Sequence, residues 1–95
     1  MDPKNDETWF DFGETLMELG FEDKALDALN TCISLEPKNA LAFYDRGKIL
    51  LHKVNTEGAM ESFKQAFALD PKLKSEFKLD YPRLASSRKF KPLIS

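Results

Sequence analysis

Residues 40–73 read ALAFYDRGKILLHKVNTEGAMESFKQAFALDPKL, and the preceding residues 6–39 read DETWFDFGETLMELGFEDKALDALNTCISLEPKN. Related side chains recur in the two segments at positions 34 residues apart: Trp9 and Phe43, Gly13 and Gly47, Leu16 and Leu50, Ala25 and Ala59, Leu29 and Phe63, Leu35 and Leu69, Pro37 and Pro71. A fixed period near this length is typical of helical repeats, which bury their apolar faces only by stacking on one another. The sequence therefore predicts an all-α array.

Two amphipathic helices are predicted in each unit. In the first unit the apolar residues recur at helical spacing along two stripes: Trp9, Phe12, Leu16 and Leu19 in one, and Ala25, Leu26, Leu29, Cys32 and Ile33 in the other. Gly20 lies between the stripes and can adopt the left-handed backbone that ends a helix. Stacked helix pairs offer a surface rather than a pocket of acids, bases and nucleophiles, so the expected function is binding.

Prolines and asparagines indicate the helix ends. Pro37 cannot continue a helix, so the second helix is expected to end just before it, and Asn39 can cap the helix that begins at Ala40. In the second unit we expect Asn55 in the left-handed position and Thr56 at the N-cap.

Small residues mark where the paired helices are expected to touch. Glycine is disfavoured inside helices, so Gly13 and Gly47 indicate a close approach that a larger side chain would overpack. Cys32 is the only cysteine and is equivalent to Ala66, which excludes an internal disulfide and indicates a small, inert, buried residue.

The chain has 95 residues, of which 42% are hydrophobic and 32% charged, a composition typical of one small domain. No apolar run approaches the roughly 18 residues of a membrane span. The first residues, MDPKNDE, lack the basic and then apolar order of a signal peptide. We therefore expect no membrane span and a cytoplasmic location.

Charge divides the chain into an acidic body and a basic end. Residues 1–71 hold 7 Lys or Arg against 14 Asp or Glu, a net charge of −7, whereas residues 72–95 hold 7 against 2, a net charge of +5. The charges of the basic end alternate with apolar residues at intervals that suit a capping helix. We therefore favour a solvated outer face over contact with nucleic acid or an acidic membrane. A homo-oligomer, in which the basic end of one molecule meets the acidic groove of another, is a further option.

The first unit contains Trp9-x-x-Phe12-Gly13-x-x-Leu16, then Gly20-Phe21, Ala25, Leu29, Cys32 and Leu35-Glu36-Pro37, and resembles one tetratricopeptide repeat from end to end. The second contains Phe43-x-x-Arg46-Gly47-x-x-Leu50, then Ala59, Phe63, Ala66 and Leu69-Asp70-Pro71, and resembles that family more closely. The resemblance covers residues 6–73. It implies a right-handed α-α superhelix, a solenoid of antiparallel helix pairs.

The resemblance divides the chain into four parts. We expect the tail of a preceding repeat at residues 1–5, repeats at 6–39 and 40–73, and a C-terminal capping helical segment at 74–95. A third repeat cannot follow, because Tyr81 replaces the close-packing glycine and Pro82 interrupts the first helix. Two repeats are fewer than a stable stack usually needs, so the cap is expected to contribute much of the stability.

In the tetratricopeptide family the first helices of successive repeats line a concave groove that holds an extended peptide or a partner's helix. The peptide-binding groove implied here consists of Glu7, Phe10, Asp11, Glu14 and Met17, with Glu18 beside them, and of Leu41, Tyr44, Asp45, Lys48, Leu51 and His52. Helical spacing independently places Phe10, Glu14 and Met17 on one face. Two interpretations stay open: a binding groove, or a face whose apolar residues cover one another and whose charges are solvated.

The acidic residues of the implied groove favour a cationic or amphipathic protein or peptide. Some tetratricopeptide domains hold the C-terminal carboxylate of heat-shock chaperones with Lys, Asn, Asn, Lys and Arg. The matching positions here are Phe10, Glu14, Asp45, Ser75 and Leu79. None has the required side chain and two are acidic, so chaperone tails are not expected partners.

We predict a non-catalytic protein-interaction module that binds a peptide or helix in the groove. The alternative is a structural C-terminal cap or self-association element of a longer solenoid. His52 is the only histidine and has no partner at catalytic or metal-ligand spacing, and the four glycines are too dispersed for a phosphate-binding loop. No catalytic residue, cofactor or metal site is therefore expected.

Overall fold

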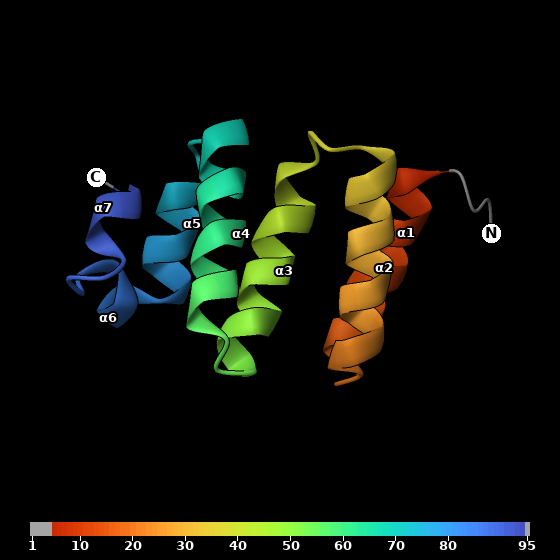
Figure 1. Ribbon diagram of the computed structural model, residues 1–95, viewed down its shortest axis with the longest axis horizontal. Helices are drawn as coiled ribbons and strands as arrows, with labels where there is room; N and C mark the ends of the chain where they lie inside the picture. Colours follow the sequence, from red (N-terminus) through yellow and green to blue (C-terminus); the bar gives the residue numbers. More distant parts are fainter. Residues whose placement is uncertain (1–4, 95) are drawn as a thin grey trace.

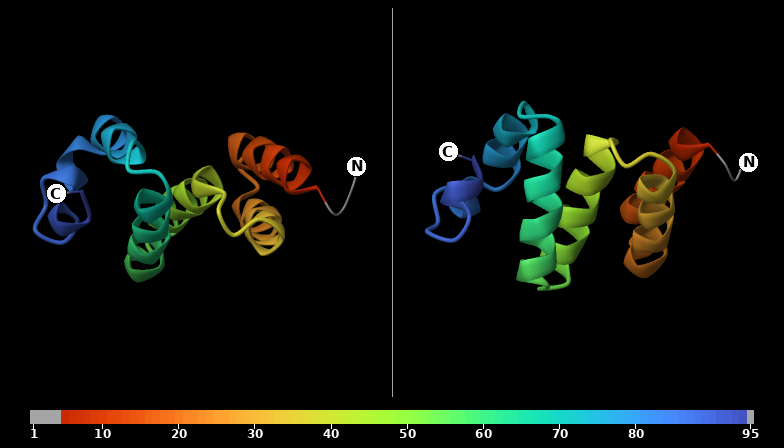
Figure 2. Two further views of the ribbon diagram at one scale, coloured as in Figure 1. Left: turned by 90° about the horizontal axis from the view of Figure 1, so that it is seen from above. Right: turned by 45° about the horizontal axis from the view of Figure 1, so that its top comes forward.

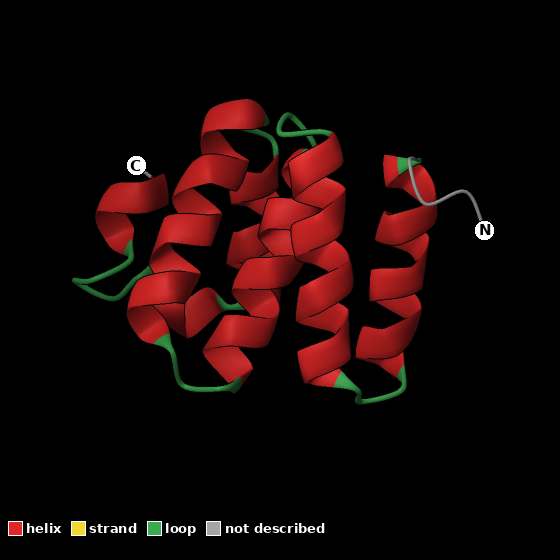
Figure 3. Ribbon diagram, turned by 45° about the vertical axis from the view of Figure 1, so that its right-hand side comes forward, coloured by secondary structure: helices red, strands yellow, loops and turns green. Residues whose placement is uncertain are grey.

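The computed structural model describes residues 5–94, and all regular structure in this part of the chain is helical (Figures 1 and 3). The helices are α1 (Asp6–Glu18), α2 (Glu22–Leu35), α3 (Ala40–His52), α4 (Thr56–Leu69), α5 (Leu73–Asp80), α6 (Pro82–Ala85) and α7 (Lys91–Ile94). The first four form two pairs, which stack through α2 and α3. The predicted α-α superhelix of antiparallel helix pairs is confirmed. The expected tail of a preceding repeat lies, apart from Asn5, outside the described residues.

Asparagine side chains begin three of the helices. The Oδ1 atoms of Asn5, Asn39 and Asn55 accept hydrogen bonds from the backbone N–H groups of Glu7, Ala42 and Gly58, at 2.9, 3.1 and 3.0 Å. Each bond satisfies one of the donors that a helix leaves unpaired at its N-terminus. The cap predicted at Asn39 is confirmed.

The turns between paired helices use a left-handed residue. Gly20 has φ of +86°, as predicted, but in the second turn the left-handed residue is Val54, with φ of +63°, and Asn55 is the N-cap. The prediction of Asn55 and Thr56 was wrong by one residue. Val54 lies 34 residues after Gly20, so the repeat geometry prevails over the low preference of a β-branched residue for this conformation.

The buried side chains form two connected clusters. The first lies between α1, α2 and α3 and consists of Leu16, Ala25, Ala28, Leu29, Cys32, Ala42 and Ile49. The second joins α3 and α4 to the C-terminal helices and consists of Phe43, Tyr44, Ala59, Phe63, Ala66, Phe67, Leu73, Phe77, Ala85 and Phe90. Ile33 packs against both clusters, so the helix pairs share one continuous interior.

Replacing Gly47 with alanine is expected to lower the free energy of unfolding by about 1–3 kcal/mol. A Cβ atom at Gly47 would lie 2.8 Å from the ring of Phe63, which is fully buried. Gly13 is the matched comparison, because its Cβ would lie 3.0 Å from the side chain of Leu29, which is also fully buried, so the approach is less close than at Gly47. Gly13→Ala should therefore cost less in urea unfolding followed by circular dichroism. An equal loss in both variants would contradict this packing.

Helices α5, α6 and α7 cover the flank of α4 that faces away from the first pair (Figure 1). Helix α5 ends at Asp80, and Pro82 is the first residue of α6. Proline lacks the N–H that would continue α5 but fits the first turn of a helix. Phe77 and Phe90 are buried in this segment, and their rings lie 5.8 Å apart between centroids.

Cys32 is a packing residue. It is fully buried, and the Asn39 amide donates a hydrogen bond to its Sγ at 3.3 Å. Burial is the main cause that raises the pKa of the thiol to about 11, so it stays protonated at neutral pH. None of the helices within residues 5–94 is long and apolar enough to cross a membrane.

Candidate peptide-binding groove

Helices α1, α3 and α5 form one side of the molecule and α2 and α4 the other (Figure 2, left). In this view α3 is set back between α1 and α5, so the three helices follow a curved line along this side. We call the face formed by α1, α3 and α5 the groove. Helices α1, α3 and α5 begin at intervals close to the repeat length, so they correspond to the first helices of successive units. The family resemblance assigns ligand binding to these helices.

Four carboxylates form a strip along α1: Glu7, Asp11, Glu14 and Glu18. Their spacing of three and four residues places them on one side of the helix, and all four residues are exposed. Within residues 5–94 none of them forms an ion pair. The strip therefore carries negative charge that no lysine or arginine within residues 5–94 pairs with.

Phe10 and Met17 lie beside this strip. Both are half-buried and pack against the first core cluster. Helical spacing directs them toward one edge of the strip, as predicted from the sequence. They offer the accessible part of an aromatic ring and of a flexible thioether next to the carboxylates, a combination that suits an amphipathic ligand.

Tyr44 is a core residue rather than an exposed contact. It is 4% exposed, its ring packs edge-on against Phe63, and its hydroxyl donates a hydrogen bond to Asp80 Oδ2 at 2.7 Å. Burial and this hydrogen bond raise the pKa of Tyr44 well above its usual value. Tyr44 thus ties α3 to the end of α5. Its replacement by alanine would disturb the core.

Asp45 is a buried acid next to α1. It is 5% exposed, and its Oδ2 atom has no hydrogen-bond partner within residues 5–94. Burial is the main cause that raises the pKa of this carboxyl to about 8, aided by a hydrogen bond with Glu14 and by the charge of Glu14, while Lys48 lowers it. At neutral pH the Asp45 side chain therefore stays mostly protonated.

The remaining predicted groove residues lie in different surroundings. Leu41 is exposed, Leu51 is half-buried against the second core cluster, and the Lys48 ammonium lies 5.7 Å from the centre of the Tyr44 ring. The His52 ring pairs with Glu22 at the start of α2, with 2.5 Å between Nδ1 and Oε2. His52 therefore pairs with a side chain of α2.

Helix α5 carries a further candidate binding residue, which was not predicted from the sequence. Leu79 is 78% exposed on the third helix of the groove. It lies 34 residues after Asp45, so the repeat period was the signal that could have identified it. Its repeat position and its exposure make Leu79 a candidate apolar contact on α5.

Arg46 joins the two helix pairs on the side away from the groove. Its Nε donates to Ser62 Oγ at 3.0 Å, its Nη1 donates to Asn30 Oδ1 at 2.9 Å, and its guanidinium lies 5.0 Å from the centre of the Phe43 ring. Burial lowers its pKa. These contacts link α2, α3 and α4 and hold the two repeats in register.

A family model described as tetratricopeptide repeat matches residues 6–39 and 40–73. The chain belongs to the tetratricopeptide repeat family. Tetratricopeptide repeats generally mediate protein–protein interactions, and their fold is generally a non-catalytic scaffold. The second of the matched tetratricopeptide repeats ends at Leu73, where α5 begins.

Solved structures share this tetratricopeptide fold. One is described as the crystal structure of MamA, with a TM-score of 0.81 and 19% sequence identity over 98% of the present chain and 56% of the MamA chain. The present chain therefore spans little more than half the length of MamA, and the likeness shows a common fold. A comparison with curated protein sequences found no match.

Proposed function

We propose that the groove binds a cationic or amphipathic segment of a partner protein, as an extended peptide or as a helix. The observation that carries this proposal is the strip of α1 carboxylates, which are exposed and form no ion pair within residues 5–94. Opposite charge on a partner would accelerate encounter and select the orientation of binding.

Apolar contacts supply the rest of the proposed site. Phe10 and Met17 border the strip, Leu41 is exposed on α3, and Leu79 is exposed on α5. Affinity in protein interfaces comes largely from a few apolar and aromatic residues, while surrounding charges add specificity. A partner segment with apolar residues and lysines or arginines would satisfy both parts.

Glu14 is the strip carboxylate that also interacts with α3, through the buried Asp45. Within residues 5–94 Glu14 forms no ion pair. A lysine or arginine of the partner placed at the exposed Glu14 carboxylate would supply one.

Panning a phage-displayed library of random peptides against the chain tests the proposal. We expect enriched peptides to combine Lys or Arg with apolar residues, and their affinity to fall at least tenfold in the Glu7→Lys/Glu18→Lys variant. The matched control, Asp27→Lys/Glu57→Lys, makes the same charge change on α2 and α4 and should leave affinity within about twofold. Enrichment of acidic peptides, or equal losses in both variants, would refute the proposed function.

The alternative function is a structural cap or self-association element of a longer solenoid. It is favoured by the covering of α4 by α5 and α7 and by the opposite charges of residues 1–71 and 72–95. Light scattering over a concentration series separates the two functions. A constant monomer mass leaves the groove free, whereas a dimer that dissociates in high salt would favour self-association through the charged parts.

A further inference from the structure

A hollow of about 530 Å³ lies in the C-terminal segment, away from the groove. It is lined by Lys78, Pro82, Ala85, Ser86, Lys91 and Ile94, from α5, α6, α7 and the residue after α6. We call it the cap pocket. Its walls are aliphatic, because Pro82, Ala85 and Ile94 contribute carbon, and its volume is enough for one large apolar side chain with its flanking backbone.

The polar groups of the cap pocket are mainly cationic donors. Lys78 and Lys91 are exposed, and neither forms an ion pair or side-chain hydrogen bond within residues 5–94. The Ser86 hydroxyl donates to the backbone carbonyls of Arg83 at 3.1 Å and Pro82 at 3.4 Å. Towards a ligand, the Ser86 oxygen can therefore only accept a hydrogen bond. Among residues 5–94, no carboxylate lines the pocket.

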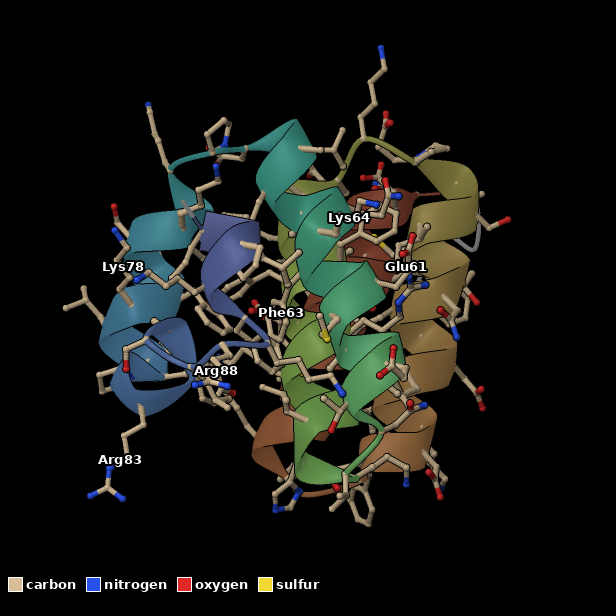
Figure 4. The ribbon with its side chains drawn as sticks, turned by 60° about the vertical axis from the view of Figure 1, so that its left-hand side comes forward. Glu61, Phe63, Lys64, Lys78, Arg83 and Arg88 are labelled. Carbon is tan, nitrogen blue, oxygen red and sulfur yellow. The ribbon has the colours of Figure 1, made fainter. Side chains whose placement is uncertain are left out.

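The surroundings of the cap pocket are also basic. Arg83 and Arg88 project from the same segment as Lys78 (Figure 4), and neither arginine forms an ion pair with another described residue. Asp80, one of two acidic residues in 72–95, accepts the hydrogen bond of Tyr44 on the groove side. Within residues 5–94 no carboxylate forms an ion pair with Lys78, Arg83, Arg88 or Lys91.

We propose that the cap pocket is a second binding site, for an acidic peptide segment of a partner protein that carries a large apolar side chain. The apolar side chain would occupy the hollow between Pro82, Ala85 and Ile94, and the flanking carboxylates would pair with Lys78 and Lys91. This site differs from the groove in position and in the sign of its charge.

The aromatic residues of the segment argue against nucleic acid as the occupant. Single-stranded nucleic acid is held by bases stacked on exposed aromatic rings as well as by basic residues. Phe77 and Phe90 are buried, Tyr81 is half-buried, and none of them lines the pocket. A membrane surface fits less well, because it is entered by protruding apolar residues and this site is a hollow.

Nuclear magnetic resonance with the blocked peptide EDELFEDE as the probe tests the proposal. Saturable shifts are expected at the backbone amides of Lys78, Ala85, Ser86 and Lys91, with a dissociation constant of about 10 µM to 1 mM for so small a contact. Affinity should fall at least tenfold in the Lys78→Glu/Lys91→Glu variant. It should fall less than twofold in Lys64→Glu/Lys72→Glu, which changes the same charge outside the pocket.

Other outcomes would overturn the proposal. Equal binding of EDESSEDE would show attraction by charge alone, and equal losses in the two charge-reversed variants would show that the pocket is not the site. Shifts of the pocket amides with protein concentration, without peptide, would assign the pocket to a second copy of the chain. Shifts produced by anionic phospholipid vesicles but not by EDELFEDE would assign it to a membrane. The spectra of the variants also report whether each remains folded.

Discussion

Replacing Phe77 with alanine is expected to lower the free energy of unfolding by about 3–5 kcal/mol. Phe77 is 1% exposed, and its ring contacts Phe63, Phe67, Tyr81 and Phe90, with centroids 4.9 to 5.8 Å away. The loss is a large part of the roughly 5–15 kcal/mol that stabilises a typical domain. The melting temperature should therefore fall by more than about 10 °C.

Leu79→Ala is the matched control for Phe77→Ala, because Leu79 lies on the same helix and is 78% exposed. It should change the free energy of unfolding by less than about 0.5 kcal/mol. Tryptophan fluorescence, which reports the first pair through Trp9, and circular dichroism should show the same shift in Phe77→Ala. An unchanged Trp9 transition would mean that the C-terminal segment does not support the first repeat.

Replacing Asp45 with asparagine is expected to stabilise the protein at alkaline pH, by several kcal/mol at pH 8.5. The folded-state pKa of Asp45, about 8, lies above the unfolded value of 3.8. Between these values the folded state binds more protons than the unfolded state, so the Asp45 contribution to stability falls as pH rises from about 4 to about 8. Asparagine has nearly the same shape and no charge, so this decline should disappear.

Urea unfolding at pH 4.5 and pH 8.5 measures the effect. The groups that act on Asp45 are Glu14 on α1, Lys48 on α3 and, at longer range, Tyr81 after α5. Asp11→Asn is the control, because Asp11 is an exposed carboxylate on α1 and its removal should leave the pH dependence unchanged. Parallel pH profiles for Asp45→Asn and the unsubstituted chain would contradict a buried, protonated Asp45.

The fold followed from the sequence because the period and the local signals agree. The 34-residue step, the glycines at helix crossings and the cap at Asn39 all specify the same helix pairs. The second turn was predicted one residue late, because residue preference favoured Asn55 over Val54. The repeat geometry placed Val54 in the left-handed conformation in spite of its β-branched side chain.

The candidate groove could be predicted only as a set of positions. The repeat places Tyr44 and Asp45 on α3. Their burial depends on how α5 and α1 pack against α3, which the period of the sequence does not specify. The course of residues 80–94 was not predictable, because helices of four residues have little periodicity and Pro82 permits several paths. The cap pocket arises from this packing and has no sequence motif.

The most direct test of binding in the groove is a nuclear magnetic resonance shift map of the chain with a basic amphipathic peptide selected by panning. The largest amide shifts are expected along the carboxylate strip of α1, near Phe10 and Met17, and at Leu41 on α3. Small shifts are predicted on the outer helices α2 and α4. Largest shifts confined to α2 and α4, or to the cap pocket, would contradict the groove as the partner-binding surface.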